Sequence, residues 1–272
     1  MSEALKWQGG VAVITGAASG IGTGLARKAA ALGMRLVLAD VQERALRDFA
    51  ATLDGEVLAV PTDVADAASV ERLARSAYER FGAVDLLFNN AGVLTTGFSW
   101  QIEPERWKRS FDINFNGVLH GLRSFVPRLL EAGRPAHIVN TSSVGGFLPS
   151  PLMAPYSASK FAVLALSESL RAELEMLKAP IGVSLLAPGP VQSGIFNDPF
   201  GPQADPAAQA FVDNMRSLLT QHGLSPDQFA ERVFAGIAQG QYWLIPQPEA
   251  FDEPFRQRNE DIAARRNPRL PW

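Results

Sequence analysis

The sequence predicts an α/β fold with a doubly wound, seven-stranded and mostly parallel sheet that carries helices on both faces. Short runs of β-branched residues and leucine alternate with segments of helical period along the 272 residues. The strand-like runs are continuously apolar, which is typical of strands covered on both faces in a parallel sheet. This alternation implies right-handed crossover connections. No repeat, low-complexity tract or Pro/Gly-rich linker divides the chain, so we expect a single domain over residues 1–272.

Seven strands and seven helices are expected in chain order. The strands are VAVIT (11–15), RLVLAD (35–40), VLAVPTDV (57–64), VDLLFNN (84–90), HIVNTSS (137–143), GVSLLAP (182–188) and YWLIP (242–246). The helices are expected near residues 20–32, 42–53, 66–81, 103–132, 156–178, 206–221 and 226–239. The segment 247–272 is charged, carries four prolines and ends on tryptophan. It is either a loosely packed extension or an arm that reaches a neighbouring subunit.

The composition excludes several classes of function. A net charge of −3 gives no electrostatic footprint for nucleic acid or an anionic membrane. The chain has no cysteine, which excludes disulfides and thiol chemistry, and its three histidines are far apart in sequence, so no metal site is expected. No run approaches the ~18 consecutive apolar residues of a membrane span. The N-terminus has no apolar stretch of signal-peptide length, and we expect a cytoplasmic protein.

A glycine-rich turn follows the first strand. In TGAASGIG (15–22), Gly16, Gly20 and Gly22 have the spacing GxxxGxG and lead directly into a helical segment. Such a turn brings backbone N–H groups and a helix N-terminus against a pyrophosphate, where side chains would obstruct the approach. The alternative is a plain structural turn between a strand and a helix.

Asp40 favours the phosphate-binding interpretation of this turn. It ends the second strand, twenty residues after Gly20. A carboxylate there is placed to hydrogen-bond both ribose hydroxyls of an adenosine and to repel a 2′-phosphate. Ser19 and Val41, at the neighbouring positions, offer no compensating cation. The sequence therefore predicts NAD as the cofactor, in preference to NADP.

The stretch YSASK places Tyr156 and Lys160 four residues apart with small residues between them. On a helix the two side chains leave the same face, roughly 5–6 Å apart at Cβ. They are either a surface pair or a proton donor beside the cation that lowers its pKa. A free tyrosine has a pKa of about 10, and both a nearby ammonium group and the positive nicotinamide ring favour the phenolate. Such a tyrosine would serve as general acid or base in alcohol oxidation.

Two further polar residues are candidates for the same site. Ser143 ends a strand before the flexible-looking loop VGGFLPSPLMAP, where its hydroxyl can hydrogen-bond a substrate oxygen as charge develops. Asn114 lies within the predicted helix 103–132, although an amide is not favoured there by helix propensity. From the residue alone, Asn114 is a satisfied helix-kink residue.

The motifs together resemble the short-chain dehydrogenase/reductase family over nearly the whole chain up to about residue 190. The stretches that carry the resemblance are TGAASGIG (15–22), AD (39–40), TDV (62–64), NNAG (89–92), INFNG (113–117), IVNTSS (138–143), YSASK (156–160) and PGPV (188–191). The pattern YxxxK alone is weak. Its position thirteen residues after Ser143, behind TGxxxGxG and NNAG in the right order, is very specific. The resemblance implies a Rossmann-type fold.

The resemblance also implies roles for individual residues. The catalytic tetrad would be Asn114, Ser143, Tyr156 and Lys160, with Asn114 holding a proton-relay water near Lys160. The dinucleotide-binding part would span about 1–190, and the residues that bind the cofactor would be Gly16, Ser19, Gly20, Ile21, Gly22, Asp40, Asp63, Val64, Asn90, Ala91, Gly92, Tyr156, Lys160, Pro188, Gly189, Val191 and Ser193. The family often has threonine where Ser193 stands, and serine keeps the hydroxyl that contacts the carboxamide.

The substrate side is predicted from apolar side chains. A substrate lid is expected over about 192–224, where the family-wide motifs end. It contributes Ile195, Phe196, Phe200, Phe211, Met215, Leu218 and Leu219, and the loop after Ser143 adds Phe147, Leu148, Leu152 and Met153. These side chains either form ordinary core or line a pocket for a bulky, aromatic or alicyclic secondary alcohol or ketone. The segments GRPAHIVNTSSVGGF and QHGLSPDQFAERV resemble a branch that contains dehydrogenases of lignin-derived aryl alcohols.

Three functions are compatible with a dinucleotide site. The first is an NAD-dependent oxidoreductase that interconverts a secondary alcohol and a ketone. The second is a non-catalytic NAD(P)-binding regulatory protein, which would be expected to lack one or more of Ser143, Tyr156 and Lys160. The third is a sugar-nucleotide epimerase or dehydratase, which normally has TGxxGxxG spacing and a longer C-terminal domain. The sequence favours the first. The resemblance implies a homotetramer or homodimer, with helices 103–132 and 156–178 at the interface.

Overall fold

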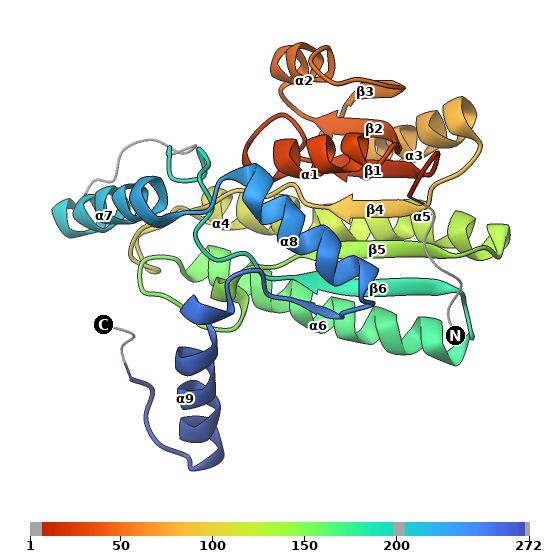
Figure 1. Ribbon diagram of the computed structural model, residues 1–272. Coiled ribbons are helices and arrows are strands. Elements are labelled where there is room, and N and C mark those ends of the chain that lie inside the picture. The colour runs from red at the N-terminus through yellow and green to blue at the C-terminus, as the bar shows by residue number, and fades with distance from the viewer. Residues whose placement is uncertain (1–6, 198–204, 270–272) are drawn as a thin grey trace.

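The computed structural model describes residues 7–197 and 205–269 and contains a seven-stranded sheet in the order β3-β2-β1-β4-β5-β6-β7 (Figure 1). Every pair of neighbouring strands is parallel. The strands are β1 (Val11–Thr15), β2 (Arg35–Asp40), β3 (Val57–Pro61), β4 (Leu86–Asn89), β5 (Ala136–Thr141), β6 (Ile181–Leu186) and β7 (Trp243–Leu244). The strand order reverses between β1 and β4, which is where doubly wound folds bind ligands at the carboxyl ends of their strands. The predicted fold class is confirmed.

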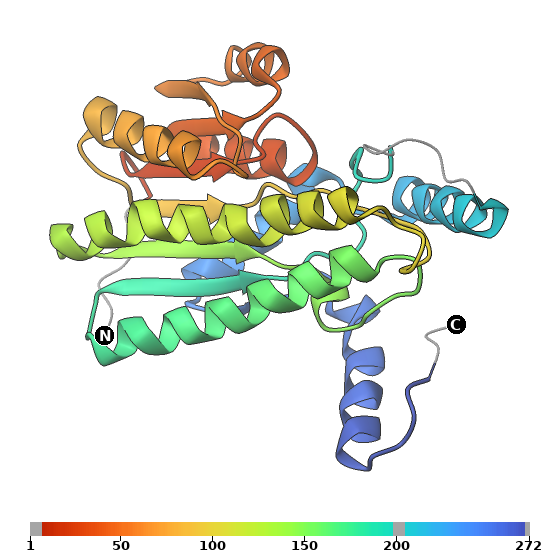
Figure 2. The same ribbon diagram turned by 180° about the vertical axis from the view of Figure 1, so that it is seen from behind.

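Helices cover both faces of the sheet. The helices α1 and α8 lie on one face (Figure 1), and α3, α5 and α6 lie on the other (Figure 2). The helices are α1 (Gly20–Ala31), α2 (Glu43–Ala50), α3 (Ala67–Phe81), α4 (Pro104–Phe111), α5 (Gly117–Ala132), α6 (Ala154–Met176), α7 (Pro206–His222), α8 (Pro226–Ala238) and α9 (Asp252–Ala263). Three short segments lie between these elements: the π-helical η1 (Asp112–Asn116) and the 3₁₀ segments η2 (Val144–Gly146) and η3 (Pro248–Ala250). No helix of the described chain has the length and apolar character to cross a membrane.

The alternation of side chains along each strand builds two cores. In β1, Val11 and Val13 join the core under α3, α5 and α6, whereas Ala12 and Ile14 join the core under α1 and α8. Successive side chains of a strand point to opposite faces, so a strand that is apolar at every position serves both cores. All five residues of β1 are buried. This double burial explains why the strand-like runs are continuously apolar.

The helix predicted over 103–132 is interrupted. Residues Asp112–Asn116 form a π-helical segment, η1, between α4 and α5. The side chain of Asn114 bonds there with the backbone of Val93 and with Ser159, outside its own helix. A π segment in a helix often marks a functional site. The prediction of one regular helix was wrong because propensity does not report contacts made across the fold.

The strand predicted over 57–64 ends earlier, at Pro61. Asp63 accepts a hydrogen bond from the N–H of Ala65, and Asp66 caps α3 by accepting from the N–H of Ala68. These local side-chain bonds turn the chain out of the sheet and start the next helix. Asp63 and Val64 therefore lie beyond the carboxyl end of β3 rather than within the strand.

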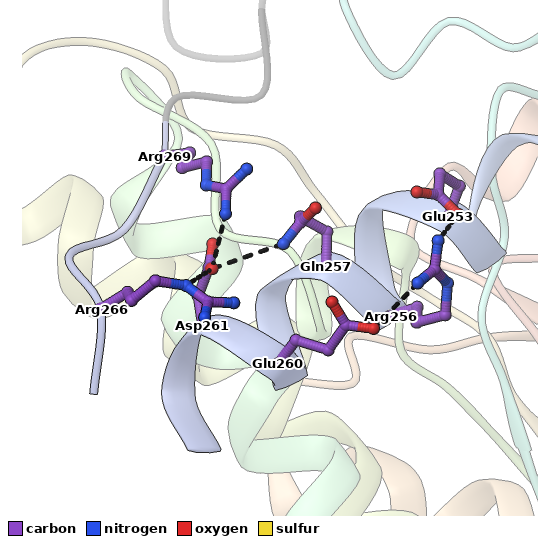
Figure 3. Close-up of polar contacts among 7 residues, drawn as sticks. All are labelled: Glu253, Arg256, Gln257, Glu260, Asp261, Arg266 and Arg269. Carbon is purple, nitrogen blue, oxygen red and sulfur yellow. Dashed lines mark hydrogen bonds and ion pairs between the residues drawn. The ribbon is translucent and has the colours of Figure 1, made fainter. Parts of the chain in front are cut away.

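The predicted tail 247–272 contains a regular helix, and its residues 270–272 lie outside the described part. Helix α9 projects from the body of the molecule (Figures 1 and 2). It is anchored at its start, where the rings of Phe251 and Phe255 pack edge-on against Phe147. Farther out, Asp261 accepts hydrogen bonds from Arg266 (2.7 Å) and Arg269 (2.9 Å), which turns the following chain back along the helix (Figure 3). Because Arg266 hydrogen-bonds this carboxylate, the pKa of Asp261 is lowered.

Candidate active site

The glycine turn after β1 has a shape that side chains would block. Gly16 and Gly20 have φ angles of 64° and 48°, a region that suits glycine. A Cβ at Gly16 would lie 2.8 Å from Cα of Ala91, and one at Gly22 would overlap the carbonyl oxygen of Gly16. The first residues of α1, Gly20 and Ile21, line the cleft above the turn, and a helix N-terminus at such a position can bind a pyrophosphate. These residues fit a dinucleotide.

Asp40 lies at the carboxyl end of β2, next to this turn. Its carboxylate accepts hydrogen bonds from the backbone N–H groups of Ala18 and Gln42, both at 3.0 Å. Asp40 therefore helps to hold the glycine turn in addition to facing the cleft. Asn90, at the end of β4, donates from Nδ2 to the carbonyl of Thr15 at 2.9 Å and so ties the two strand ends together.

Tyr156 and Lys160 lie on the first turns of α6, and both are buried. The ammonium group of Lys160 lies 5.8 Å from the centroid of the Tyr156 ring and donates to the carbonyl of Thr141 at 2.8 Å. Pro155 stands in the first turn of the helix, where its missing N–H costs nothing. The pair therefore lies inside the molecule, against the end of β5, and is not a surface pair.

The pKa values of the two side chains are governed by burial. Burial raises the pKa of Tyr156, and a hydrogen bond with Ser143 acts in the opposite direction. Burial lowers the pKa of Lys160 to about 8, because the ammonium form is disfavoured away from water. The predicted lowering of the tyrosine pKa is not found in the protein without its cofactor, where the pKa of Tyr156 is raised. Burial is the largest cause of that rise.

Ser143 follows β5 and caps η2 by accepting a hydrogen bond from the N–H of Gly145 at 3.0 Å. A Cβ at Gly145 would lie 3.3 Å from Cε1 of Tyr156 and 3.5 Å from Oγ of Ser143. The absence of a side chain at this position lets the serine hydroxyl and the phenol approach each other. Ser143 and Tyr156 therefore present two hydroxyl groups to one point of the cleft.

Asn114 stands behind the cleft and does not line it. Its Oδ1 accepts from the N–H of Val93 at 2.8 Å, and its Nδ2 donates to the carbonyl of Val93 at 2.9 Å. A Cβ at Gly92 would lie 3.3 Å from this Oδ1 and 3.4 Å from Nζ of Lys160, so Asn114 and Lys160 flank the same glycine. The side chain of Asn114 thus joins η1 to the backbone of Val93 by hydrogen bonds, beside Lys160.

One cleft of about 770 Å³ brings the predicted residues together at the carboxyl ends of the strands. Every predicted site residue lines it except Gly22, which packs beneath the glycine turn, and Asn114. The predicted residues on its walls are Gly16, Ser19, Gly20, Ile21, Asp40, Asp63, Val64, Asn90, Ala91, Gly92, Ser143, Tyr156, Lys160, Pro188, Gly189, Val191 and Ser193. Among the described residues on its walls, Arg109 and Lys160 are the only lysine or arginine side chains.

The far end of the cleft is apolar, as predicted, but its lining differs in part. The side chains that line it are Leu94, Leu148, Met153, Ile195, Phe196, Met215, Leu218 and Leu219. Phe147, Leu152 and Phe211 do not line it, and Phe200 lies outside the described residues. For Phe147 the structure supports the core alternative, because its ring is buried against Phe251, Phe255 and Trp243.

Sequence reasoning missed several residues of the cleft. Leu94 lies two residues after NNAG, and Ile113 is the first residue of INFNG. Both residues therefore lie in or beside a motif. Arg109, Ser150 and Asn197 carry no motif. Arg109 reaches the cleft from α4 and lies 3.7 Å from Asp63.

Comparisons with known proteins agree with this geometry. A family model described as short chain dehydrogenase matches residues 10–201. A Cα-dehydrogenase of Sphingobium sp. strain SYK-6 is 38% identical over 252 residues, which cover 89% of this chain and 82% of that protein. A 1-deoxy-11-β-hydroxypentalenate dehydrogenase of Streptomyces arenae is 43% identical over 189 residues, covering 67% of each protein. A crystal structure of a short-chain dehydrogenase/reductase from Burkholderia phymatum in complex with NAD has a TM-score of 0.94 and 41% identity, with 98% of each chain covered.

The chain belongs to the short-chain dehydrogenase/reductase family and is an oxidoreductase. The family recognised from the motifs is thereby confirmed, together with the class of enzyme. The similarity to a Cα-dehydrogenase agrees with the resemblance to aryl-alcohol dehydrogenases.

Proposed function

We propose that this protein is an NAD-dependent oxidoreductase that interconverts a bulky, apolar secondary alcohol and its ketone, with Tyr156 as general acid and base. One observation carries the proposal. The phenol of Tyr156 and the hydroxyl of Ser143 line one cleft together with Lys160, between a glycine turn and an apolar end. A proton acceptor, a hydrogen-bond donor and a cation then surround the position of the reacting oxygen.

The side chains divide the chemistry between them. In alcohol oxidation, Oη of Tyr156 takes the hydroxyl proton while Oγ of Ser143 donates a hydrogen bond to the substrate oxygen. The ammonium group of Lys160, held by Thr141, stabilises the phenolate that must form. Bound NAD supplies the acceptor for the hydride that leaves the carbinol carbon. In ketone reduction, Tyr156 returns its proton to the same oxygen.

The cofactor assignment rests on the cradle and on Asp40. The glycines let the turn pack closely against the backbone of Ala91 and Gly16, where a Cβ would collide, and such a tight glycine turn brings a helix N-terminus close to a pyrophosphate. Asp40 faces the cleft beside it and disfavours a 2′-phosphate by charge. The similar protein from Burkholderia phymatum, whose structure contains NAD, supports the same assignment.

The substrate class rests on the apolar end of the cleft. Leucine, isoleucine, methionine and phenylalanine side chains line it, and the described residues there place no lysine or arginine to bind a phosphate or carboxylate. The similarity to a Cα-dehydrogenase and to a hydroxypentalenate dehydrogenase supports an alcohol carbon carried by a bulky skeleton. The family resemblance also supports a homodimer or homotetramer, which analytical ultracentrifugation would test.

The test is a panel of aryl and alicyclic secondary alcohols with NAD, followed by the absorbance of NADH. On the best substrate, Tyr156→Phe keeps the ring but removes the transferable proton, so turnover falls by about 10²–10⁴-fold or more while NAD affinity changes little. Tyr242→Phe is the matched control, because that buried hydroxyl has no hydrogen-bond partner among the described residues. A Tyr156→Phe protein that keeps most of its activity would contradict the mechanism, and NAD binding without turnover of any alcohol would favour the regulatory alternative.

A further inference from the structure

We propose that Ser159 is a positioning residue for this reaction, because its hydroxyl joins Asn114 to Tyr156 inside the protein. The inference rests on the proposed function, since it concerns the geometry of the tyrosine that moves the proton. Ser159 lies on α6, one residue before Lys160, and does not line the cleft. It acts through its neighbours and makes no contact with substrate.

A single oxygen atom makes the connection. Oγ of Ser159 accepts a hydrogen bond from Nδ2 of Asn114 at 3.0 Å and donates one to the carbonyl of Tyr156 at 2.7 Å. Both Ser159 and Asn114 are 0% exposed, so water does not compete for these bonds. The hydroxyl therefore fixes the π-helical segment, which carries Asn114, to the first turn of α6.

Removal of this hydroxyl would change the surroundings of Lys160 and Tyr156. Nδ2 of Asn114 would keep its bond to the carbonyl of Val93 but lose its second partner in a buried position. A buried N–H without a partner is costly, so the amide is expected to shift. Oδ1 of Asn114 and Nζ of Lys160 flank Gly92, 3.3 and 3.4 Å from the position that a Cβ would take there. A shift of the amide thus changes the polar surroundings of the lysine.

Ser157 offers a matched comparison on the same helix. It is 3% exposed, as buried as Ser159 in practice, yet its Oγ has no hydrogen-bond partner among the described residues. The two serines flank Ala158 and lie within one helical turn. If burial of a small polar side chain were all that mattered, alanine at either position would have the same effect.

The experiment compares Ser159→Ala with Ser157→Ala in the full-length protein. For Ser159→Ala we expect kcat for alcohol oxidation to fall by about tenfold or more, because small misplacements of catalytic groups are costly. The apparent pKa of its pH–rate profile should rise, and the Kd for NAD, measured by fluorescence titration, should change less than about twofold. Ser157→Ala should match the wild type in all three quantities.

A double-mutant cycle tests the connection itself. If Ser159 acts through Asn114, Ser159→Ala should have little additional effect in an Asn114→Ala background, because contacting residues are not additive. Full additivity, or a Ser159→Ala protein with wild-type kcat and pH profile but a lower Tm, would overturn the proposal. Ser159→Cys replaces the alanine variant if the latter does not fold, with the same expectations, since a thiol is only a weak hydrogen-bonding group.

Tyr156→Phe is measured alongside and separates the two proposals. If Tyr156→Phe is active, the proposed mechanism fails whatever Ser159 does. If Tyr156→Phe is inactive and Ser159→Ala behaves as the wild type, the mechanism stands and only the positioning role of Ser159 fails.

Discussion

At the scale of single residues, Lys160 is a buried cation in the candidate site that lowers the stability of the folded protein. Its side chain is 3% exposed, and a carbonyl group, that of Thr141, accepts its hydrogen bond. Burial lowers the pKa of Lys160 to about 8 from an ordinary value of 10.5. At neutral pH the folded protein therefore holds a buried cation, which is unfavourable for folding. Functional sites commonly retain such groups against stability.

We predict that Lys160→Met lowers turnover but raises the free energy of unfolding at pH 7 by about 1–3 kcal/mol. Because the folded pKa of about 8 lies below the unfolded value, the unfolded chain binds more protons between about pH 8 and 10.5. The stability of the wild type therefore rises over that range, and the advantage of the variant shrinks. Urea unfolding at several pH values measures this, with the exposed Lys178→Met as control. Equal stability at pH 7 would refute it.

Asp40 combines a local structural role with cofactor selection. Its carboxylate holds Ala18 and Gln42 and also faces the cleft. We predict a preference for NAD over NADP of about tenfold or more in kcat/KM, equivalent to ~1.4 kcal/mol. Asp40→Ala should weaken NAD binding and narrow this preference, as steady-state kinetics with both cofactors would show. Equal use of both cofactors by the wild type would contradict the role of Asp40.

At the scale of elements, α7 closes the apolar end of the cleft. Val212 and Leu219 of this helix pack in one cluster with Leu94, Tyr156 and Phe196. Arg216 donates to the carbonyl of Phe196 at 2.7 Å and thereby ties α7 to the chain that follows β6. The helix stands off from the sheet on the side of the carboxyl ends of the strands (Figure 1). These contacts join the predicted lid to Tyr156, the proposed general base.

We predict that α7 is protected from hydrogen exchange more strongly when NAD and an alcohol are bound than in their absence. A lid that closes on its ligands gains contacts on binding. Helix α8 is the internal control, because Phe229, Val233 and Phe234 bury it in the core beside α1 and its protection should not change. Equal protection of α7 in both states would show that it is fixed core rather than a lid.

At the scale of the whole molecule, His137 couples the stability of the sheet to pH. It lies near the start of β5, at the opposite edge from the cleft, and its Nε2 pairs with Oγ of Ser184 on β6 at 2.8 Å. Burial lowers its pKa to about 4 from an ordinary 6.5. Folding therefore favours the neutral form of His137. This residue does not line the cleft, so its titration is separate from the proposed reaction.

We predict that His137 makes the protein less stable in mild acid. Between about pH 6.5 and 4 the unfolded chain binds a proton that the folded chain does not, so the free energy of unfolding falls by about 2–3 kcal/mol over that range. His137→Gln should reduce this pH dependence in denaturant titrations. His222→Gln, an exposed residue at the end of α7, should leave it unchanged. An unaltered slope in His137→Gln would contradict the assignment.

The candidate site could be predicted best from the sequence where its chemistry is encoded locally. The glycine turn, Asp40 and the pair Tyr156 and Lys160 each carry a spacing with its own physical reason, and the structure brings them into one cleft. For Phe147, hydrophobicity alone leaves two alternatives open, ordinary core and pocket lining. That property does not distinguish a ring that faces substrate from one that packs under α9.

The sequence by itself determined the order of strands and helices, the crossover topology and the family of this protein. The period of the apolar residues, the spacing of the glycines and the order of the motifs are properties of the sequence itself, so they can be read without a structure. The tertiary structure alone decided the π segment at Asn114, the helical arm α9 and the direction in which burial shifts the pKa of Tyr156. Each of these depends on contacts between residues far apart in sequence, and desolvation in particular is set by everything that packs around a side chain.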